Sequence, residues 1–304
     1  MNRASYDELK ELLARFDLKE SPEGARAGED NATLVIALEE YFSGRENVHS
    51  VLGIDIYRYS QFPAETQRLV PLAFEYLYRW TVHEASSGEP MILAEPDLNG
   101  RFISTGDGGF QILDSPLQAL VFAIFMQANV QSFNAGFVLP RLRRHLGPLT
   151  LRYAITRDTL FQLDANWFGS AIISNARVLS RDRLNRCLID ERSVSWFGEH
   201  LGSIESLQLR NIQNLRGVPN LLAHPEADLK SLLFSAGARS PFPNDFRACN
   251  VQKIGVVTAK QDELDLYNLH VQIGLIYSVS HEGSSADHPI MVTLGNLNTS
   301  GITA

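Results

Sequence analysis

The fold is decided by the stretch VLGIDI, residues 51–56. Its side chains are apolar apart from Asp55, and the polar stretch RYSQ, residues 58–61, follows soon after. A short apolar run that is rich in β-branched residues is typical of a buried strand. The run therefore predicts a strand over residues 51–57 that presents the carboxylate of Asp55 near its end.

A second informative stretch is STGDGG, residues 104–109, which has the composition of a tight turn. It lies between RFI, residues 101–103, and FQIL, residues 110–113, and so predicts a hairpin with Asp107 in its turn. Two carboxylates brought together from strand ends form a hard oxygen site of the kind that binds Mg²⁺ or Mn²⁺. Because these ions handle nucleotide phosphates, we expect phosphoryl chemistry on a nucleotide.

The elements around these two carboxylates follow in a clear order. Apolar residues at positions 69, 72, 73, 76, 77 and 80 predict an amphipathic helix after the first strand. Pro116 opens a second helix, residues 149–156 alternate as a half-buried strand, and a helix over 170–180 precedes a strand over 187–189. The predicted fold class is α+β, with a ferredoxin-like β-α-β-β-α-β sheet, helices on one face, and additions.

Both ends of the chain differ from this central region in pattern. Helices are expected over residues 5–18 and about 33–41, with a polar linker over 20–31 between them. After residue 220, prolines and glycines interrupt the chain, and strands are expected over 252–257, 269–279 and 290–294. We therefore divide the chain into an N-terminal helical segment (1–47), a central domain (48–220) and a small β-rich C-terminal extension (221–304).

Composition narrows the class of protein. The 304 residues are 44% hydrophobic and 20% charged, which is ordinary for a soluble domain, and the net charge of −8 argues against a nucleic-acid duplex as partner. No apolar run approaches a bilayer span, and the charged N-terminus is unlike a secretion signal. Cys187 and Cys249 are widely separated, as expected for core residues in a reducing compartment. We therefore expect a cytoplasmic protein.

Five short motifs in order resemble the catalytic domain of class III nucleotidyl cyclases, the family of adenylate and guanylate cyclases. The resemblance extends over about residues 48–220. The motifs are DIYRYS (55–60), GDG (106–108), LRYAI (151–155), the eight-residue spacing from Gly169 to Arg177, and LRGV (215–218). Each motif alone is weak, and their common order is what makes the resemblance specific.

The resemblance implies a role for each matching residue. Asp55 and Asp107, with the backbone carbonyl of Ile56, would hold two Mn²⁺ or Mg²⁺ ions per site, and Tyr59 and Ser60 would lie on the loop near the substrate phosphates. Arg177 of the opposite subunit would stabilise charge on the α-phosphate, since its planar fork suits phosphate oxygens. The implied assembly is a head-to-tail homodimer with sites between the subunits.

The chain departs from the family where purine bases are recognised. Ile103 stands where the family has Lys or Glu, and Asn166 stands where it has Asp, Thr or Cys. The family's transition-state Asn falls on Ile173, although Asn175 lies two residues on and a shifted alignment would supply it. Neither the adenine nor the guanine pair is therefore present.

Two interpretations follow, and both stay open here. In the first, the domain is a catalytically silent nucleotide-sensing module. In the second, bulky Tyr57 and Arg58 adapt the site to a one-ring base, and the chain resembles the pyrimidine cyclases of bacterial antiphage (Pycsar) systems. Such an enzyme would make cyclic UMP or cyclic CMP for a separately encoded effector. Asn166 suits either base, whereas Arg101 would donate to a carbonyl and so favours UTP. An adenylate cyclase with an atypical pocket is a further alternative.

Overall fold

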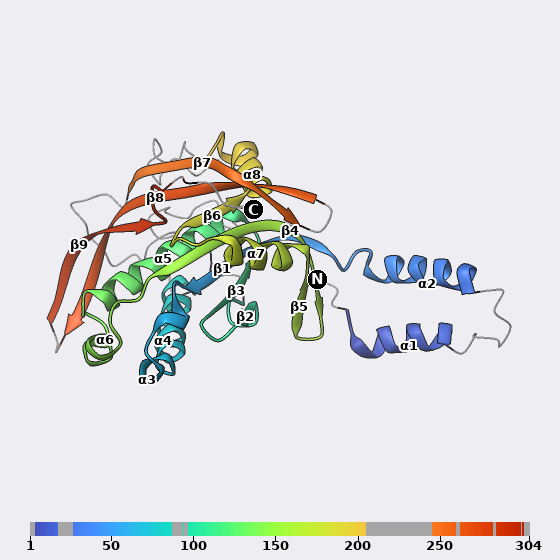
Figure 1. Cartoon of the computed structure of the whole chain (residues 1–304), viewed down its shortest axis with the longest axis horizontal. Coiled ribbons are helices and arrows are strands. Elements are labelled where there is room, and N and C mark those ends of the chain that lie inside the picture. Colours follow the sequence, from blue (N-terminus) through green and yellow to red (C-terminus); the bar gives the residue numbers. More distant parts are fainter. Residues whose placement is uncertain are drawn as a thin grey trace.

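The described residues of the chain form one continuous mixed sheet with helices on both faces (Figure 1). This computed structural model describes residues 4–17, 27–86, 93, 97–204, 245–259, 262–281, 284–298 and 300. Within these residues the strand order is β2-β3-β1-β4-β6-β8-β7, with β5 paired to β4 and β9 paired to β8. The strands are β1 Asn47–Ile56, β2 Phe102–Ser104, β3 Gly108–Leu113, β4 Leu151–Leu163, β5 Asn166–Gly169, β6 Cys187–Asp190, β7 Asp245–Ala259, β8 Asp262–His281 and β9 Ser284–Leu294.

The helices complete the predicted order β1-α4-β2-β3-α5-β4, followed by α7 and β6. They are α1 Tyr6–Asp17, α2 Ala27–Phe42, α3 Ala64–Gln67, α4 Val70–Ser86, α5 Pro116–Asn134, α6 Pro140–Leu146, α7 Ser170–Arg181 and α8 Glu191–Leu201, with a 3₁₀ turn at Tyr59–Gln61. Helix α5 begins where the sequence indicates, because Ser115 caps it by accepting a hydrogen bond from the Gln118 N–H at 3.2 Å. The α+β prediction is confirmed.

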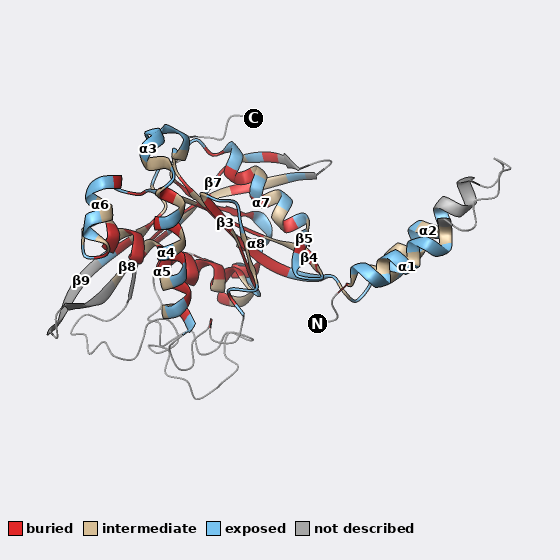
Figure 2. Cartoon of the chain, turned by 90° about the horizontal axis from the view of Figure 1, so that it is seen from below, coloured by how far each residue is buried: buried red, intermediate tan, exposed pale blue. Residues whose placement is uncertain are grey.

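Alternate residues of β1 face two different layers of the molecule. Leu52, Ile54 and Ile56 are buried in the larger core with α4, α5 and α8. Helix α5 is buried almost all round, as its red colouring in Figure 2 shows, because neighbouring elements cover it on several sides. Val51, Gly53 and Asp55 alternate with the first set and so face the other layer, which contains α7. The carboxylate of Asp55 therefore lies on the α7 side of the sheet.

Helix α7 is tied to this second face by a buried amide. The Nδ2 of Asn175 donates to the carbonyl oxygens of Val51 and Ala154 at 2.8 and 3.0 Å, and to the hydroxyl of Thr156 at 3.1 Å. Gly53 permits this close approach, since a Cβ there would lie 1.9 Å from the Asn175 Oδ1. The sequence prediction placed helices on one face, which holds for α4 and α5, and α7 covers the other face.

The C-terminal strands extend the central sheet. Strand β8 pairs antiparallel with β6, so that Cys187 stands opposite Leu269, and β7 and β9 flank β8. Each of these strands is longer than its prediction. The domain boundaries at 47/48 and 220/221 stay predictions, and the motif LRGV at 215–218 lies outside the described residues.

Helices α1 and α2 form an arm that projects from the sheet (Figure 1). The Tyr41 hydroxyl joins them, accepting from the Ser5 N–H at 2.9 Å and donating to the Ser5 carbonyl at 3.1 Å. The predicted linker over 20–31 is wrong for residues 27–31, because α2 already begins at Ala27. Gly28, Asp30 and Asn31 are poor helix formers, so the local sequence did not show that the helix starts this early.

Two compositional expectations can be examined in the described residues. Cys187 and Cys249 are both buried free thiols. Among the described helices, none combines the length and apolar character required to cross a bilayer.

Candidate functional site: a carboxylate pair at the end of the first strand

Asp55 lies at the end of β1, between two neighbouring strands. It stands opposite Gly108 of β3 and opposite Arg152 of β4. The Arg152 Nε donates to the Asp55 Oδ2 in an ion pair. Burial raises the pKa of the Asp55 carboxyl above its usual 3.8; the nearby Arg152 acts in the opposite direction, and the charge of Asp107 adds to the rise.

Asp107 is fixed beside Asp55 by the backbone of its turn. The Ile56 N–H donates to the Asp107 carbonyl at 3.2 Å. Gly106 has φ 101°, a value that glycine adopts without strain, and a Cβ on Gly108 would lie 2.1 Å from the Ile54 carbonyl oxygen. The two glycines therefore allow the turn to close against β1, and the structure brings the two predicted acidic residues together.

This donor set fits a hard divalent cation. Two carboxylates and the carbonyl of Ile56 are oxygen ligands, which Mg²⁺ and Mn²⁺ prefer. Mg²⁺ is commonly held by one or two carboxylates, with water and substrate phosphates completing its shell. Among the described residues there is no group of three or more His, Cys, Asp and Glu that would hold a metal by itself. A cation here would thus depend on this pair and on substrate oxygens.

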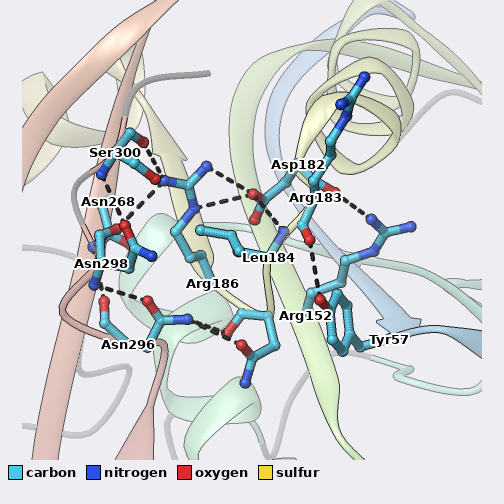
Figure 3. Close-up of polar contacts among 11 residues, drawn as sticks. Tyr57, Arg152, Asp182, Arg183, Leu184, Arg186, Asn268, Asn296, Asn298 and Ser300 are labelled. Carbon is cyan, nitrogen blue, oxygen red and sulfur yellow. Dashed lines mark hydrogen bonds and ion pairs between the residues drawn. The ribbon is translucent and has the colours of Figure 1, made fainter. Parts of the chain in front are cut away.

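Arg152 is a residue of this candidate site that the sequence analysis missed. It appeared there only within the motif LRYAI, and the register of β4 against β1 places it directly opposite Asp55. Its Nη1 donates to the backbone carbonyl of Asp182, just after α7 (Figure 3). One sequence feature could have indicated this position: Arg152 alternates along β4 with Tyr153 and Ile155, which face the main core, so Arg152 faces α7.

The loop after β1 begins beside the carboxylate pair. The Tyr57 hydroxyl donates to the Arg183 carbonyl at 3.1 Å, and the guanidinium carbon of Arg58 lies 4.9 Å from the centre of the Tyr57 ring. Tyr59 packs against the main core and its hydroxyl donates to the Gln67 carbonyl at 3.4 Å. Ser60 is exposed in the 3₁₀ turn.

Arg177 belongs to a different surface. Asn175 faces the sheet, and Arg177 lies about 200° further round the helix at 100° per residue, on the outward side. Ile173 shares that side and is 41% exposed. Within the described residues the Arg177 guanidinium has no ion-pair partner. Since Asn175 is fully buried and its amide nitrogen is engaged, it does not supply the family's transition-state Asn.

The two base-recognition candidates lie at different distances from the carboxylate pair in one chain: Ile103 is on the hairpin that contains Asp107, and Asn166 is far away along β4. Ile103 packs in the α7-side cluster that includes Trp167. Asn166 is exposed and pairs with Leu163, so it stands 11 positions along β4 from the residue opposite Asp55, about 36 Å at 3.3 Å per residue.

Arg101 is engaged at the other end of β1. Its Nη1 donates to the Asp114 Oδ1 at 2.7 Å, and Asp114 follows Leu113, which pairs with Ser50. The structure therefore brings together Asp55, Asp107, Ile56 and the loop after them. In a single chain it places Arg101 and Asn166 elsewhere along the strands, and Arg177 on the outward side of α7.

Comparison with known proteins gives structural likeness alone. No family model and no curated protein matches the sequence. Among solved structures, the adenylyl cyclase CyaB from P. aeruginosa aligns at 12% identity and TM-score 0.42, covering 74% of this chain and 94% of that one. The adenylate/guanylate cyclase/hydrolase from Silicibacter pomeroyi aligns at 15% identity and TM-score 0.38, covering 74% and 96%.

The catalytic core of a rhodopsin-guanylyl cyclase with converted specificity, in complex with ATPalphaS, aligns at 9% identity and TM-score 0.43, again covering 74% and 96%. Similarities of this size assign no activity. The chemistry is therefore inferred from this chain's own residues.

Proposed function

We propose that this protein is a pyrimidine nucleotide cyclase, a phosphorus–oxygen lyase that converts UTP to 3′,5′-cyclic UMP and pyrophosphate. The observation that supports this most directly is the pairing of β1 with β3, which places Asp55 beside the turn that contains Asp107. The two residues lie far apart in sequence and meet at the open end of a strand, as a two-metal site requires.

Asp55, Asp107 and the carbonyl of Ile56 would hold two Mn²⁺ or Mg²⁺ ions. When bound, such ions lower the pKa of the ribose 3′-hydroxyl and neutralise the triphosphate. The 3′-hydroxyl would lose its proton to water, the 3′-oxygen would bond to the α-phosphorus in line, and the bond from that phosphorus to the oxygen bridging the β-phosphate would break, so that pyrophosphate leaves. The loop with Tyr59 and Ser60 follows the carboxylates directly, so its backbone approaches the phosphates.

Arg177 would act on the substrate held by a twin subunit. Its guanidinium is on the outward side of α7 and has no ion-pair partner among the described residues, so it is available to a second chain. A guanidinium positioned at the α-phosphate stabilises the charge that develops there. This favours a head-to-tail homodimer with two sites, each made from both subunits.

The pyrimidine assignment is supported by the residues next to the carboxylates. Tyr57 and Arg58 stack on each other immediately after Ile56, and Ile103 replaces a polar base-recognition residue. The Arg101 Nη1 donates to Asp114, which leaves its other N–H groups as the donors that favour a uracil carbonyl, and Asn166 suits either pyrimidine. We name UTP as the substrate and CTP as the alternative.

By its resemblance to the Pycsar cyclases, the product would be a second messenger in antiphage defence, made in the cytoplasm and sensed by a separately encoded effector.

A second candidate function is a catalytically silent nucleotide-sensing module. Ile173 favours it, since an apolar side chain stands where the cyclase family has its transition-state Asn and Asn175 is buried.

A substrate panel separates these proposals. Pure protein is incubated with Mn²⁺ and each of the four ribonucleoside triphosphates separately, and products are identified by mass spectrometry. Cyclic UMP is the expected product, and cyclic CMP would establish the alternative substrate. Turnover of ATP alone would overturn the pyrimidine assignment, whereas nucleotide binding without pyrophosphate release would support the silent module.

A further inference from the structure

A cavity of about 610 Å³ lies between helix α8 and the start of β1. Helix α8 forms one side of it, and the first turn of α5 with neighbouring residues of β1 and β4 forms the rest. Val48 of β1 lines the cavity, whereas Asp55 lies seven residues further along that strand, about 23 Å away at 3.3 Å per residue. The cavity is therefore separate from the proposed metal site, and its volume is typical of a small-molecule site.

Two ion pairs account for much of the charge in this cavity. Asp158 pairs with Arg192, and Asp114 pairs with Arg101 at 2.7 Å. Glu191 lies in the first turn of α8, where the positive end of the helix dipole favours a carboxylate. These groups are therefore balanced without a ligand.

Arg157 and Glu199 also line the cavity, and in the part of the chain that the structure describes neither side chain forms an ion pair. Of the Arg157 guanidinium nitrogens, only Nη1 has a hydrogen bond there, to the backbone carbonyl of Asp114 at 3.2 Å. Burial lowers the pKa of the Arg157 guanidinium, and the negative charges of Asp190 and Glu199 act in the opposite direction. Glu199 thus lies near enough to influence Arg157 without bonding to it.

The Arg157 side chain starts from a fixed backbone position. The Arg157 N–H donates to the Oδ2 of the buried Asp190 at 3.0 Å, and Arg157 stands opposite Ser50 in the pairing of β4 with β1. The residue is half-buried, so its guanidinium has lost part of its hydration, and an anion bound there would replace it. The cavity therefore presents a fixed cation with a carboxylate close to it.

An aromatic pair forms part of the wall beside these charges. The rings of Trp196 and His200 stack with their centroids 4.3 Å apart and their planes at 16°. The His200 Nδ1 donates to the Trp196 carbonyl at 2.8 Å, since a carbonyl oxygen only accepts, and Nε2 is the other polar atom of the ring. With Val48 and Ser195, this wall offers both apolar and hydrogen-bonding groups to a ligand.

We propose that this cavity binds a free α-amino acid, with the carboxylate of the amino acid on Arg157 and its ammonium group on Glu199. The opposite charges of an α-amino acid are carried by groups one carbon apart, which suits a cation and a carboxylate that lie near each other without bonding. The side chain of the amino acid would lie along Trp196 and Val48. A nucleoside triphosphate does not suit the charge of the cavity, which is lined by four carboxylates and only two guanidinium groups.

Binding would need neither metal nor nucleotide, because no residue of the carboxylate pair lines the cavity. The test is therefore calorimetric titration of the full chain with each of the common α-amino acids, in the absence of both. At least one amino acid should bind with a Kd below about 1 mM. Its N-acetyl derivative lacks the ammonium group and its carboxamide lacks the carboxylate, so each should bind at least about tenfold more weakly.

Arg157→Gln should weaken binding of that amino acid about tenfold, and Glu199→Gln about threefold, because an exposed carboxylate contributes less to an ionic contact. The matched controls are Arg79→Gln and Glu75→Gln, which remove the same two charges from an exposed ion pair on α4, outside the cavity. Both controls should bind as the wild type does. Because Glu199 is exposed, its variant keeps the fold and still tests the contact if Arg157→Gln does not fold.

Absence of binding by every amino acid, equal binding of the two derivatives and the parent amino acid, unchanged binding by Glu199→Gln, or an equal loss in the controls would overturn the proposal. None of these results would affect the proposed cyclase activity, which the substrate panel measures separately.

Discussion

Asp190 is a buried carboxylate at the start of α8. Its Oδ1 accepts from the Ser193 N–H at 2.9 Å and its Oδ2 from the Arg157 N–H at 3.0 Å. Burial raises the pKa of this carboxyl from 3.8 to about 6, against the effect of these hydrogen bonds. Between these values the folded protein binds more protons than the unfolded chain, so the stability should fall as the pH rises.

The predicted change is on the order of 3 kcal/mol between pH 4 and pH 7, since one pKa unit corresponds to about 1.4 kcal/mol. Urea unfolding of the wild type and of Asp190→Asn at both pH values measures it. The difference in unfolding free energy between the two proteins should move in favour of the variant as the pH rises. A pH-independent difference would show that Asp190 titrates normally in the fold.

If Asp55 and Asp107 hold the metal ions, the activity should depend on both carboxylates. Asp55→Asn and Asp107→Asn each remove a ligand charge while preserving shape, so Mn²⁺-dependent pyrophosphate release should fall at least about 100-fold. Asp7→Asn, at an exposed position on α1, is the control and should keep full activity. Retention of activity in either site variant, measured with a coupled pyrophosphate assay, would remove the metal mechanism.

At the level of elements, the contact of α7 with β1 depends on Gly53. A methyl group there would lie 1.9 Å from the Asn175 Oδ1 and 2.7 Å from a Leu179 methyl carbon. Gly53→Ala should therefore lower the free energy of unfolding by about 1–3 kcal/mol, as overpacking does. Gly198→Ala in α8 is the matched control: nothing lies within 4 Å of its Cβ position, and it should stabilise by about 0.5–1 kcal/mol.

The free energies of unfolding of both glycine variants are measured by thermal and urea unfolding and compared with the wild-type value. Equal effects at the two positions would show that α7 adjusts to the added methyl group and that the close approach is not required.

The sequence predicted those helices and strands whose local residue pattern indicates which kind of element they form. The helix after β1, the hairpin at Asp107 and helix α5 follow from periodicity, turn composition and the Ser115–Pro116 start. The meeting of Asp55 with Asp107 was also predicted, because both residues were placed at strand ends and the family resemblance paired them.

Features that depend on long-range pairing were not predicted. The Arg152 contact with Asp55 needs the register of β4 against β1, which neither strand shows by itself. The pairing of β8 with β6 is also long-range, and neither strand's sequence predicts it. This pairing brings the residues after β9 to Arg186 (Figure 3). Arg101 was expected to donate to a uracil carbonyl, and the sequence did not show its partner Asp114, which lies across the hairpin.

At the scale of the whole molecule, the net charge of the protein bears on how it could bind a nucleotide. The net charge of −8 repels a polyanionic triphosphate, so the proposed function requires divalent cations at the carboxylate pair and a guanidinium near the phosphates. In one chain Asp55 belongs to the sheet, and Arg177 lies on the side of α7 that is turned away from the sheet. The proposed function therefore predicts that a complete site needs two copies, with the pair from one and Arg177 from the other.

Mixing two inactive variants tests this central claim most directly. Asp55→Asn and Arg177→Ala should each be inactive alone, because every site in each homodimer lacks one essential group. After unfolding and refolding an equal mixture, half of the dimers are mixed and each has one intact site, so we predict recovery of about a quarter of wild-type cyclic-nucleotide formation. Activity that stays at the level of the separate variants would contradict a site shared between two subunits.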